Sequence, residues 1–554
     1  MILSRYISVV LLICCSEFGI AQRVSNEQLQ GWHLRDKDKD GYIGVSLQKA
    51  LQYLESKKST TVVVAVLDGG IDTLHEDLIN KLWKNPKEIP DNGIDDDHNG
   101  YIDDVYGWNF LGNAKGENIL KESNEYARVY HQLKNWYDLN KNDTNCLKTY
   151  YPETYNLWVK VNSYLEISAD EKMNYNILKT STDNAIKYEQ LLKSEIGCDE
   201  LNASVLESYA PKSDKTKKAK IGFLNYIKIF EIDREKNTSV IFSEVNSFLD
   251  KKKSFIFAKD SPVVNYRKMI IGDEADGLSG KKYGNSNVMA SMCKHGTHVS
   301  GIIAAERDNQ LGIDGICNDA KIMTVRVVPD GDEHDQDVAL GIRYAVNNGA
   351  RVINMSFGKN ISPQKNLVDE AIMYAAEKDV LIIKAAGNES MNLNQNNIYP
   401  SKKLYNNKIA ENIITVGSSS DWNIDSSLVA AYTNYGSAHV DILAPGSYIY
   451  STISSGNNSY GFENGTSMSS PIVAGIAALI RSYYPGLTAV EVKKCILGSA
   501  DTTYINEVFF TPGSRTEKIP MREVCATGGI VNAYHAVLLA NELYLSKQRG
   551  IKKK

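Results

Sequence analysis

The sequence predicts an α/β domain with a doubly wound, mostly parallel sheet and helices on both faces of that sheet. Short runs rich in Val and Ile are apolar on both sides, which is typical of parallel strands that helices cover on both faces. The clearest of these runs are residues 61–68, 321–328, 351–357, 379–388 and 412–419. Segments with helical spacing, such as 337–350 and 366–379, lie between them. This alternation predicts the doubly wound arrangement.

The composition is that of a globular protein with a large core. Of the 554 residues, 43% are hydrophobic and 23% are charged. The formal net charge is −5, so the overall charge indicates neither a nucleic-acid partner nor an anionic membrane surface. After the N-terminal segment there is no uninterrupted run of about 18 apolar residues, and we expect no integral membrane span. The oligomeric state stays open.

The first 21 residues have the pattern of a signal peptide. Arg5 supplies a positive charge, residues 7–15 are apolar but too few to span a bilayer, and small residues up to Ala21 offer a cleavage site. We therefore expect an exported chain that begins at Gln22, whether secreted, periplasmic or on the cell surface. The alternative is a buried N-terminal strand.

A lipid anchor is a second possible outcome of export. Cys14 or Cys15 could be lipidated after cleavage, but Ile13 is a poor residue in front of such a cysteine. We expect a chain without an anchor.

The chain is expected to divide into a discontinuous α/β domain and one insertion. The expected segments are a signal peptide at 1–21, the first part of the α/β domain at 22–113, a helical insertion at 114–263, the remainder of the α/β domain at 264–545 and a basic tail at 546–554.

The expected insertion differs in composition from the rest of the chain. It is rich in Lys, Glu, Asn and Tyr, and apolar residues within 176–196 recur at helical spacing. Residues 211–220 are basic and carry no core pattern, so we expect an exposed loop there. A disordered linker is the alternative for the whole segment. The insertion could serve as a lid, as a substrate-selecting arm or as a folding aid.

Six cysteines follow the expected signal peptide, an even number that permits disulfides in an exported chain. Pairing between sequence neighbours is a hypothesis for all six, namely Cys146, Cys198, Cys293, Cys317, Cys495 and Cys525.

A candidate nucleophile lies in the segment 465–480. Ser467 follows Gly-Thr and precedes a long apolar helix, so its hydroxyl could be exposed at a loop-to-helix junction. The positive end of the helix would favour a negative charge that develops beside it. A serine needs a base to act as a nucleophile. Taken alone, the same segment could be an ordinary helix cap.

Two further segments offer a base and a carboxylate. His295 begins a small-residue helix at 294–305, and His298 follows one turn later. A histidine pair can bind zinc, but the Glu of the metalloprotease pattern is missing, so a base with a structural second histidine is favoured. Asp68 ends the apolar run 61–68, where sites of open α/β sheets lie. A strand-end cap is the alternative for Asp68.

Together these segments resemble a known family. VAVLDGG, HGTHVSG and GTSMSSP, in the order Asp–His–Ser, resemble the three signatures of subtilisin-like serine proteases (subtilases), here of a secreted bacterial type with a large helical insertion between Asp and His. The resemblance extends to four other segments, which are HEDL (75–78), NMSFG (354–358), AAGN (385–388) and NYGSAHVDILAPG (434–446).

The resemblance implies a serine endopeptidase that acts through an acyl-enzyme intermediate. Ser467 would attack the peptide carbonyl, and His295 would accept its proton and return it to the leaving amine. Asp68 would orient His295 and stabilise its cation. Asn388 matches the asparagine that binds the oxyanion together with the serine backbone N–H.

The resemblance also implies protein or peptide substrates. Ser356, Phe357 and Gly358 match the segment that pairs with an extended substrate, main chain to main chain. Gly387 and its neighbours would form one wall of the pocket for the side chain before the cleaved bond.

Two positions depart from the family pattern. Gly69 replaces the usual Ser or Thr after the aspartate, and Ser469 replaces the usual Ala after Ser-Met. Both residues are small, so we expect an altered rate rather than lost activity. The alternative function is a catalytically weak or inactive binding protein with the same fold.

The segment 94–104 is a candidate site for a structural calcium ion, and no catalytic metal is expected. Acidic and amide side chains alternate before Gly100 as in the first half of a calcium loop, but the twelfth position holds Tyr106 instead of Glu. The alternative is a solvated acidic turn. The expected oxygen ligands are Asp95, Asp97, Asn99, the carbonyl of Tyr101, and Asp103 or Asp104.

Overall fold

The computed structural model describes residues 25–230, 232–272, 282–290, 293–454 and 459–551. The described chain forms two compact units, one of residues 123–264 and the other of residues 25–122 with 265–551. The expected signal peptide, with Cys14 and Cys15, lies outside the described residues.

The larger unit is built around a seven-stranded sheet in which each neighbouring pair of strands is parallel. Its strands, in the order β2-β3-β1-β4-β5-β6-β7, confirm the predicted fold class. Their bounds are β1 (Val62–Asp68), β2 (Gly107–Asn109), β3 (Ala320–Arg326), β4 (Val352–Met355), β5 (Leu381–Ala385), β6 (Ile413–Ser419) and β7 (Ile442–Pro445).

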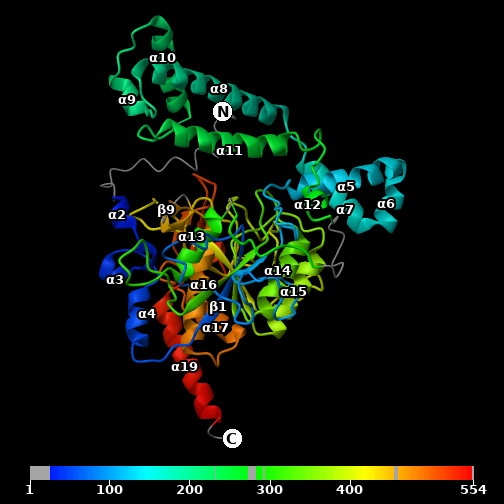
Figure 1. The fold of residues 1–554 in the computed structure, drawn as a ribbon, viewed down its shortest axis with the longest axis vertical. Helices are drawn as coiled ribbons and strands as arrows, with labels where there is room; N and C mark the ends of the chain where they lie inside the picture. Colours follow the sequence, from blue (N-terminus) through cyan, green and yellow to red (C-terminus); the bar gives the residue numbers. More distant parts are fainter. Residues whose placement is uncertain (1–24, 231, 273–281, 291–292, 455–458, 552–554) are drawn as a thin grey trace. The chain divides into compact units, whose positions relative to one another are not determined.

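Alternate residues of β1 enter two different hydrophobic cores. Val64 and Val66 belong to the core that α13 (Lys294–Ala304) and α16 (Thr466–Tyr483) complete, whereas Ala65 and Leu67 belong to the core beneath α14 (Asp335–Asn347) and α15 (Lys365–Glu377). The two helix pairs lie on different sides of the sheet (Figure 1). Burial on both faces explains why the strands are mostly apolar on both of their sides.

The remaining elements of this unit surround the sheet. The helices are α2 (Asn26–Leu29), η1 (Trp32–Leu34), α3 (Lys37–Asp40), α4 (Leu47–Leu54), α12 (Tyr266–Ile270), α17 (Ala489–Gly498), α18 (Met521–Val524) and α19 (Ala533–Ile551). Two antiparallel ribbons pair β8 (Ile449–Ile453) with β9 (Ser459–Glu463) and β10 (Val508–Phe510) with β11 (Lys518–Pro520). The last helix, α19, continues through residues expected to form the basic tail.

The smaller unit is helical. Apolar side chains of α8, α9, α10 and α11 share one core, which includes Leu192, Leu206, Phe223 and Phe242. The rings of Tyr130 and Trp158 stack between α5 and α7. Its helices are α5 (Glu125–Asn140), η2 (Lys141–Asp143), α6 (Thr144–Tyr150), α7 (Pro152–Tyr164), α8 (Ala169–Ile196), α9 (Ala203–Ser208), α10 (Asp214–Ile229) and α11 (Thr238–Ile256).

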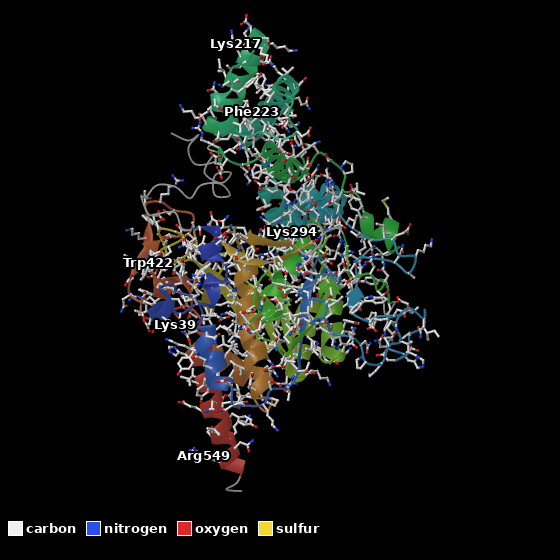
Figure 2. All side chains as sticks on the ribbon, turned by 60° about the vertical axis from the view of Figure 1, so that its left-hand side comes forward. Lys39, Lys217, Phe223, Lys294, Trp422 and Arg549 are labelled. Atoms are coloured by element: carbon white, nitrogen blue, oxygen red, sulfur yellow. The ribbon has the colours of Figure 1, made fainter. Side chains whose placement is uncertain are left out.

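The loop expected at 211–220 was predicted wrongly, because α10 begins within it. Ser213 caps this helix in a capping box with Thr216. Lys217 points outward and Phe223 points into the unit (Figure 2). The basic residues are therefore the exposed face of an amphipathic helix whose buried face begins with Thr216 and Ala219.

The disulfide hypothesis was also wrong. All six cysteines, which are described residues, are free thiols, and four of them are buried. Cys317 and Cys495 fill positions in the core around α16 and act there as small apolar side chains.

None of the helices in the described ranges is both long enough and apolar enough to cross a membrane.

Candidate active site

The carboxyl ends of β1 and β4 lie next to each other at the point where the strand order changes direction. Leu67 is in register with Met355, so the next residues, Asp68 and Ser356, leave the sheet side by side. Side chains that follow neighbouring parallel strands at such a point typically form the binding site of an open α/β sheet.

Asp68 and His295 are in direct contact. The ring atom Nδ1 of His295 lies 2.9 Å from Oδ2 and 3.0 Å from Oδ1 of Asp68, and the backbone N–H of Gly69 donates to Oδ1 at 2.7 Å. The close approach needs a glycine after His295, because a Cβ on Gly296 would lie 2.2 Å from the carbonyl oxygen of Gly70. The small residues of the motif thus let α13 pack tightly against the turn at the end of β1.

Two opposing effects act on the imidazole of His295. Loss of contact with water lowers its pKa, but the charge of Asp68 and its hydrogen bond to the ring raise it more, so the pKa lies above its ordinary value. Asp68 is buried, whereas 44% of the His295 side chain is exposed. The ring can therefore take up a proton from a group on its exposed side.

Ser467 lies in the first turn of α16 and is tied to Ser356. Its Oγ donates to the carbonyl oxygen of Ser356 at 3.1 Å, and the Oγ of Ser356 donates to the carbonyl oxygen of Ser467 at 2.8 Å. These bonds place Ser467 at the end of β4, the strand beside β1. Between Ser467 and His295 the described structure contains no hydrogen bond; contacts of this kind often form only in the substrate complex.

The side-chain amide of Asn388 is oriented by Thr466. Oδ1 of Asn388 accepts hydrogen bonds from the backbone N (2.8 Å) and Oγ1 (3.0 Å) of Thr466, which in turn accepts one from the backbone N of Gly387 at 3.0 Å. Because Oδ1 is engaged, the amide nitrogen of the exposed Asn388 is the group left to bind an oxyanion. Sequence reasoning treated Thr466 only as the residue before Ser467 and missed this orienting contact.

A family model described as Subtilase family matches residues 268–518 of the chain. The thermophilic serine proteinase of Bacillus sp. (strain AK1) is 36% identical over 220 residues, which are 40% of this chain and 50% of that protein. Subtilisin DY of Bacillus licheniformis is 36% identical over 220 residues, which are 39% of this chain and 73% of that protein. The chain belongs to the subtilase family.

A third relative of this subtilase is the cell wall-associated protease of Bacillus subtilis (strain 168), which is 34% identical over 270 residues, or 48% of this chain and 28% of that protein. The subtilase therefore spans only half or less of the length of two of these relatives.

The subtilase leaves the backbone of Phe357 and Gly358 available for pairing. Both residues follow β4 in an irregular segment, and their backbone N–H and C=O groups make no hydrogen bond to the described residues. Lys359, by contrast, exchanges two backbone bonds with Tyr399. Gly387 lies in the loop after β5, the strand beside β4, where its φ of 101° suits glycine.

His298 is fully buried in α13, and its Nε2 donates to the carbonyl oxygens of Ile449 and Gly461 at 3.0 and 3.2 Å. Burial lowers its pKa to about 3, so the ring is neutral. Because Nε2 is already engaged, the geometry favours a structural histidine over one half of a zinc-binding pair with His295.

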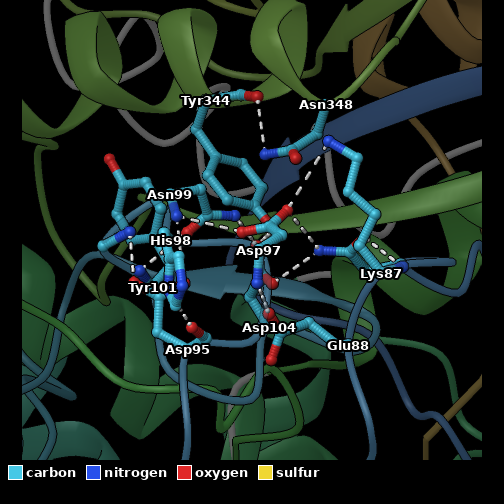
Figure 3. Close-up of polar contacts among 12 residues, drawn as sticks. Lys87, Glu88, Asp95, Asp97, His98, Asn99, Tyr101, Asp104, Tyr344 and Asn348 are labelled. Carbon is cyan, nitrogen blue, oxygen red and sulfur yellow. Dashed lines mark hydrogen bonds and ion pairs between the residues drawn. The ribbon is translucent and has the colours of Figure 1, made fainter.

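The acidic loop at 94–104 brings together two of the expected metal ligands and one residue that sequence reasoning missed. Carboxylate oxygens of Glu88, Asp95 and Asp97 all lie within 4.8 Å of one another (Figure 3). Glu88 lies seven residues before Asp95, outside any calcium-loop spacing, and the folded loop alone shows its position. In the described ranges no other group of three such side chains could hold a metal ion.

The other expected ligands of the subtilase have protein partners. The carboxylate of Asp103 accepts hydrogen bonds from the backbone N–H groups of Asn92 and Gly93 at 3.1 and 2.8 Å. Asp104 is buried and accepts one from the hydroxyl of Tyr344 at 2.6 Å; burial raises the pKa of Asp104 to about 6.

Two more of the expected ligands lie between these groups. Oδ1 of Asn99 accepts a hydrogen bond from the backbone N–H of Tyr101 at 2.7 Å, and the Tyr101 ring packs edge-on against Tyr344. Asn99 and Tyr101 therefore help to hold the loop in shape.

Proposed function

We propose that this chain is a serine endopeptidase that hydrolyses peptide bonds of protein or peptide substrates. The observation that carries the proposal is the Asp68–His295 contact at the end of β1, next to the end of β4, where Ser356 is hydrogen-bonded to Ser467. In the mechanism, the Ser467 hydroxyl rotates away from the Ser356 carbonyl, gives its proton to Nε2 of His295 and attacks the substrate carbonyl.

Each remaining group has a role in that mechanism. Asp68 stabilises the imidazolium of His295, while the amide of Asn388 and the backbone N–H of Ser467 bind the oxyanion of the tetrahedral intermediate. His295 then protonates the leaving amine, and the acyl group stays on Ser467 until water, activated by the same histidine, releases it.

The proposed substrate is extended where it crosses the site. Its backbone would pair with the open groups of Phe357 and Gly358 as an added strand, next to Ser356. The side chain before the cleaved bond would then lie between this segment and Gly387. Backbone pairing of this kind restricts side chains little, so many sequences could be accepted.

A fluorophosphonate probe, which labels activated serines, tests the proposal. We expect the wild-type chain to react with the probe and to cleave casein. The control variant Ser426→Ala, which replaces an exposed serine after β6, should do the same. Ser467→Ala should lose both signals. A folded wild-type chain that neither reacts with the probe nor cleaves casein would instead support the inactive binding protein.

We also propose that Glu88, Asp95 and Asp97 hold a structural calcium ion. Only 7% of Glu88 is exposed, and its Oε2 has no hydrogen-bond partner among the described residues. Burial is the main cause of a raised pKa at Glu88. A bound cation would pair with this oxygen and offset the repulsion among the carboxylates, and oxygen ligands suit calcium. The ion would stabilise the loop and take no part in the reaction.

We further infer export of the chain, from the N-terminal pattern and from a relative described as cell wall-associated. N-terminal sequencing of the protein from the culture medium, the periplasm and the cell surface tests it. A start at Gln22 is expected; a start at a lipid-modified Cys14 or Cys15 would show the anchored route instead.

A further inference from the structure

Arg326 is a buried cation beside the candidate catalytic aspartate. It ends β3, where its Cα is in register with that of Asp68, and none of its surface is exposed. Nε donates to the carbonyl oxygen of Gly69 at 2.9 Å, Nη1 to Oδ1 of Asn109 at 3.0 Å and Nη2 to the carbonyl oxygen of Ile119 at 2.9 Å. Burial lowers the pKa of Arg326 to about 10, so it stays charged at neutral pH.

All three acceptors of Arg326 are neutral, which is unusual for a buried arginine. Within the described ranges no carboxylate forms an ion pair with it, whereas the buried Arg267 pairs with Asp337 and the buried Arg481 with Asp379. A buried charge without an opposite charge is unfavourable. A purely structural position would be served as well by an apolar side chain, so the directed hydrogen bonds indicate a further role.

One of the three bonds of Arg326, the one from Nε, ends on the turn that follows Asp68. The N–H of Gly69 donates to the Asp68 carboxylate, and the C=O of the same residue accepts from Arg326. The carbonyl oxygen of Asp68 itself accepts hydrogen bonds from the backbone N–H groups of Val327 and Val328 at 2.9 and 3.2 Å. Two successive carbonyl groups, those of Asp68 and Gly69, are thus held by the end of β3 and the two residues that follow it.

Gly69 makes this restraint necessary. A glycine has more backbone freedom than any other residue, and at this position it has no hydroxyl that could hold the carboxylate. The bond from Arg326 fixes the peptide group between Gly69 and Gly70, which the backbone freedom of Gly69 would otherwise leave able to rotate. A guanidinium with donors in a rigid fork can hold several acceptors at once, which a single ammonium group does less well.

We propose that Arg326 is a positioning residue that holds the Asp68–Gly69 turn so that the carboxylate faces His295. This inference rests on the proposed peptidase function, because it assigns a role in the same reaction. Arg326 touches neither Ser467 nor the segment 356–358, so it acts on the turnover step and leaves substrate binding unchanged.

The test compares Arg326→Lys and Arg326→Met with the wild type and with Arg481→Met. The control removes a buried arginine from the far end of α16, where Arg481 contacts Asp379 instead of the site. The first readout is the second-order rate constant with which the fluorophosphonate labels Ser467, measured against pH and normalised to the amount of folded protein. The others are kcat and KM on a peptide substrate and the melting temperature.

We expect labelling and kcat to fall by about 10- to 100-fold in Arg326→Met with KM unchanged, a size that small misplacements of catalytic groups produce. The acidic limb of the pH profile should move to lower pH, because a displaced Asp68 raises the pKa of His295 less. Arg326→Lys, which keeps the charge but loses the fork, should recover part of the rate. The control should lose melting temperature but keep its rate and pH profile.

The proposal would be overturned if the labelling rate and pH profile of Arg326→Met stayed at the wild-type values while its melting temperature fell as in the control. Should Arg326→Met not fold, Arg326→Lys decides alone, by the same comparison with the wild type. A wild-type chain that does not react with the probe would overturn the peptidase function itself, which separates the two failures.

Discussion

Oδ1 of Asn388 accepts hydrogen bonds from both the backbone N and the Oγ1 of Thr466, the residue directly before Ser467. The candidate oxyanion donor and the candidate nucleophile are therefore linked through a single residue at the start of α16. A small displacement of Thr466 would move both groups relative to the substrate carbonyl.

Replacement of Thr466 by Val tests this link. The variant loses the hydroxyl that donates to Asn388 and accepts from the N–H of Gly387, while the backbone bond stays. We expect kcat to fall about fivefold, since about 1 kcal/mol of hydrogen bonding corresponds to roughly that factor. Thr466→Ser, which keeps the hydroxyl, should retain the wild-type kcat. Equal values for both variants would show that the hydroxyl has no orienting role.

Replacement of Asn388 by Ala should have a larger effect. It removes a donor to the oxyanion, and the loss of one such donor lowers kcat by about 10²–10³, a size established for subtilisin. KM should change little, because the donor acts mainly in the transition state. A rise in KM at constant kcat would instead indicate a residue that binds the ground state.

As the pH is lowered, the rate of peptide hydrolysis should begin to fall at a higher pH than the ordinary pKa of a histidine would give. In the proposed mechanism His295 must be neutral to accept the proton of Ser467, and Asp68 holds the pKa of His295 above the ordinary value of about 6.5. The acidic limb of kcat/KM against pH should therefore lie above that value. In Asp68→Asn the limb should move to lower pH, together with a drop in kcat of about 10⁴. An unmoved limb would mean that a different group titrates.

Calcium should stabilise the wild-type chain, and Glu88 should be essential to that effect. We expect a chelator to lower the melting temperature of the wild type and to leave Glu88→Gln unaffected. Binding at 100 times Kd contributes about 2.7 kcal/mol of stability. Asp103→Asn is the control: its carboxylate holds Asn92 and Gly93, so the variant should melt lower yet still respond to calcium. The opposite pattern would favour Asp103 as a ligand.

Stability should decrease on acidification partly because of His33. This side chain is fully buried and neither ring nitrogen has a hydrogen-bond partner among the described residues; burial, followed by electrostatic interactions with His298 and Arg35, lowers its pKa to about 3. The unfolded chain binds the proton near pH 6.5, so it holds more protons than the folded chain between about pH 6.5 and 3. The contribution of neutral His33 to the free energy of unfolding is therefore complete above about pH 6.5 and is lost as the pH falls from there towards about 3.

His33→Phe should weaken that pH dependence. The variant removes the titrating group and two unpaired polar atoms while it keeps a ring of similar shape. We expect a smaller drop in melting temperature between pH 7 and pH 4 than in the wild type. His535→Phe, at an exposed position of α19, should keep the wild-type slope. Identical slopes in all three proteins would show that His33 does not determine acid sensitivity.

The sheet was predictable because its strands carry their signal locally. The runs that became β1, β3, β4, β5 and β6 are mostly apolar and almost completely buried, as expected for strands that are covered on both faces. The short strand β2 and the exposed ribbon of β10 and β11 have only three residues each, too few for a pattern. The helix at 214–229 was missed in part because Thr216 and Ala219, the buried residues of its first turns, are small and give little apolar signal among the surrounding lysines.

The sequence by itself determined the order of the chemical motifs and the doubly wound sheet, because both are written in short, contiguous segments. Only the tertiary structure decided which distant groups meet. It placed Arg326 on the turn after Asp68, Thr466 on Asn388 and Glu88 beside Asp95 and Asp97. Such contacts depend on strand register and loop path, which no local pattern encodes, and burial then sets the charge that each group carries.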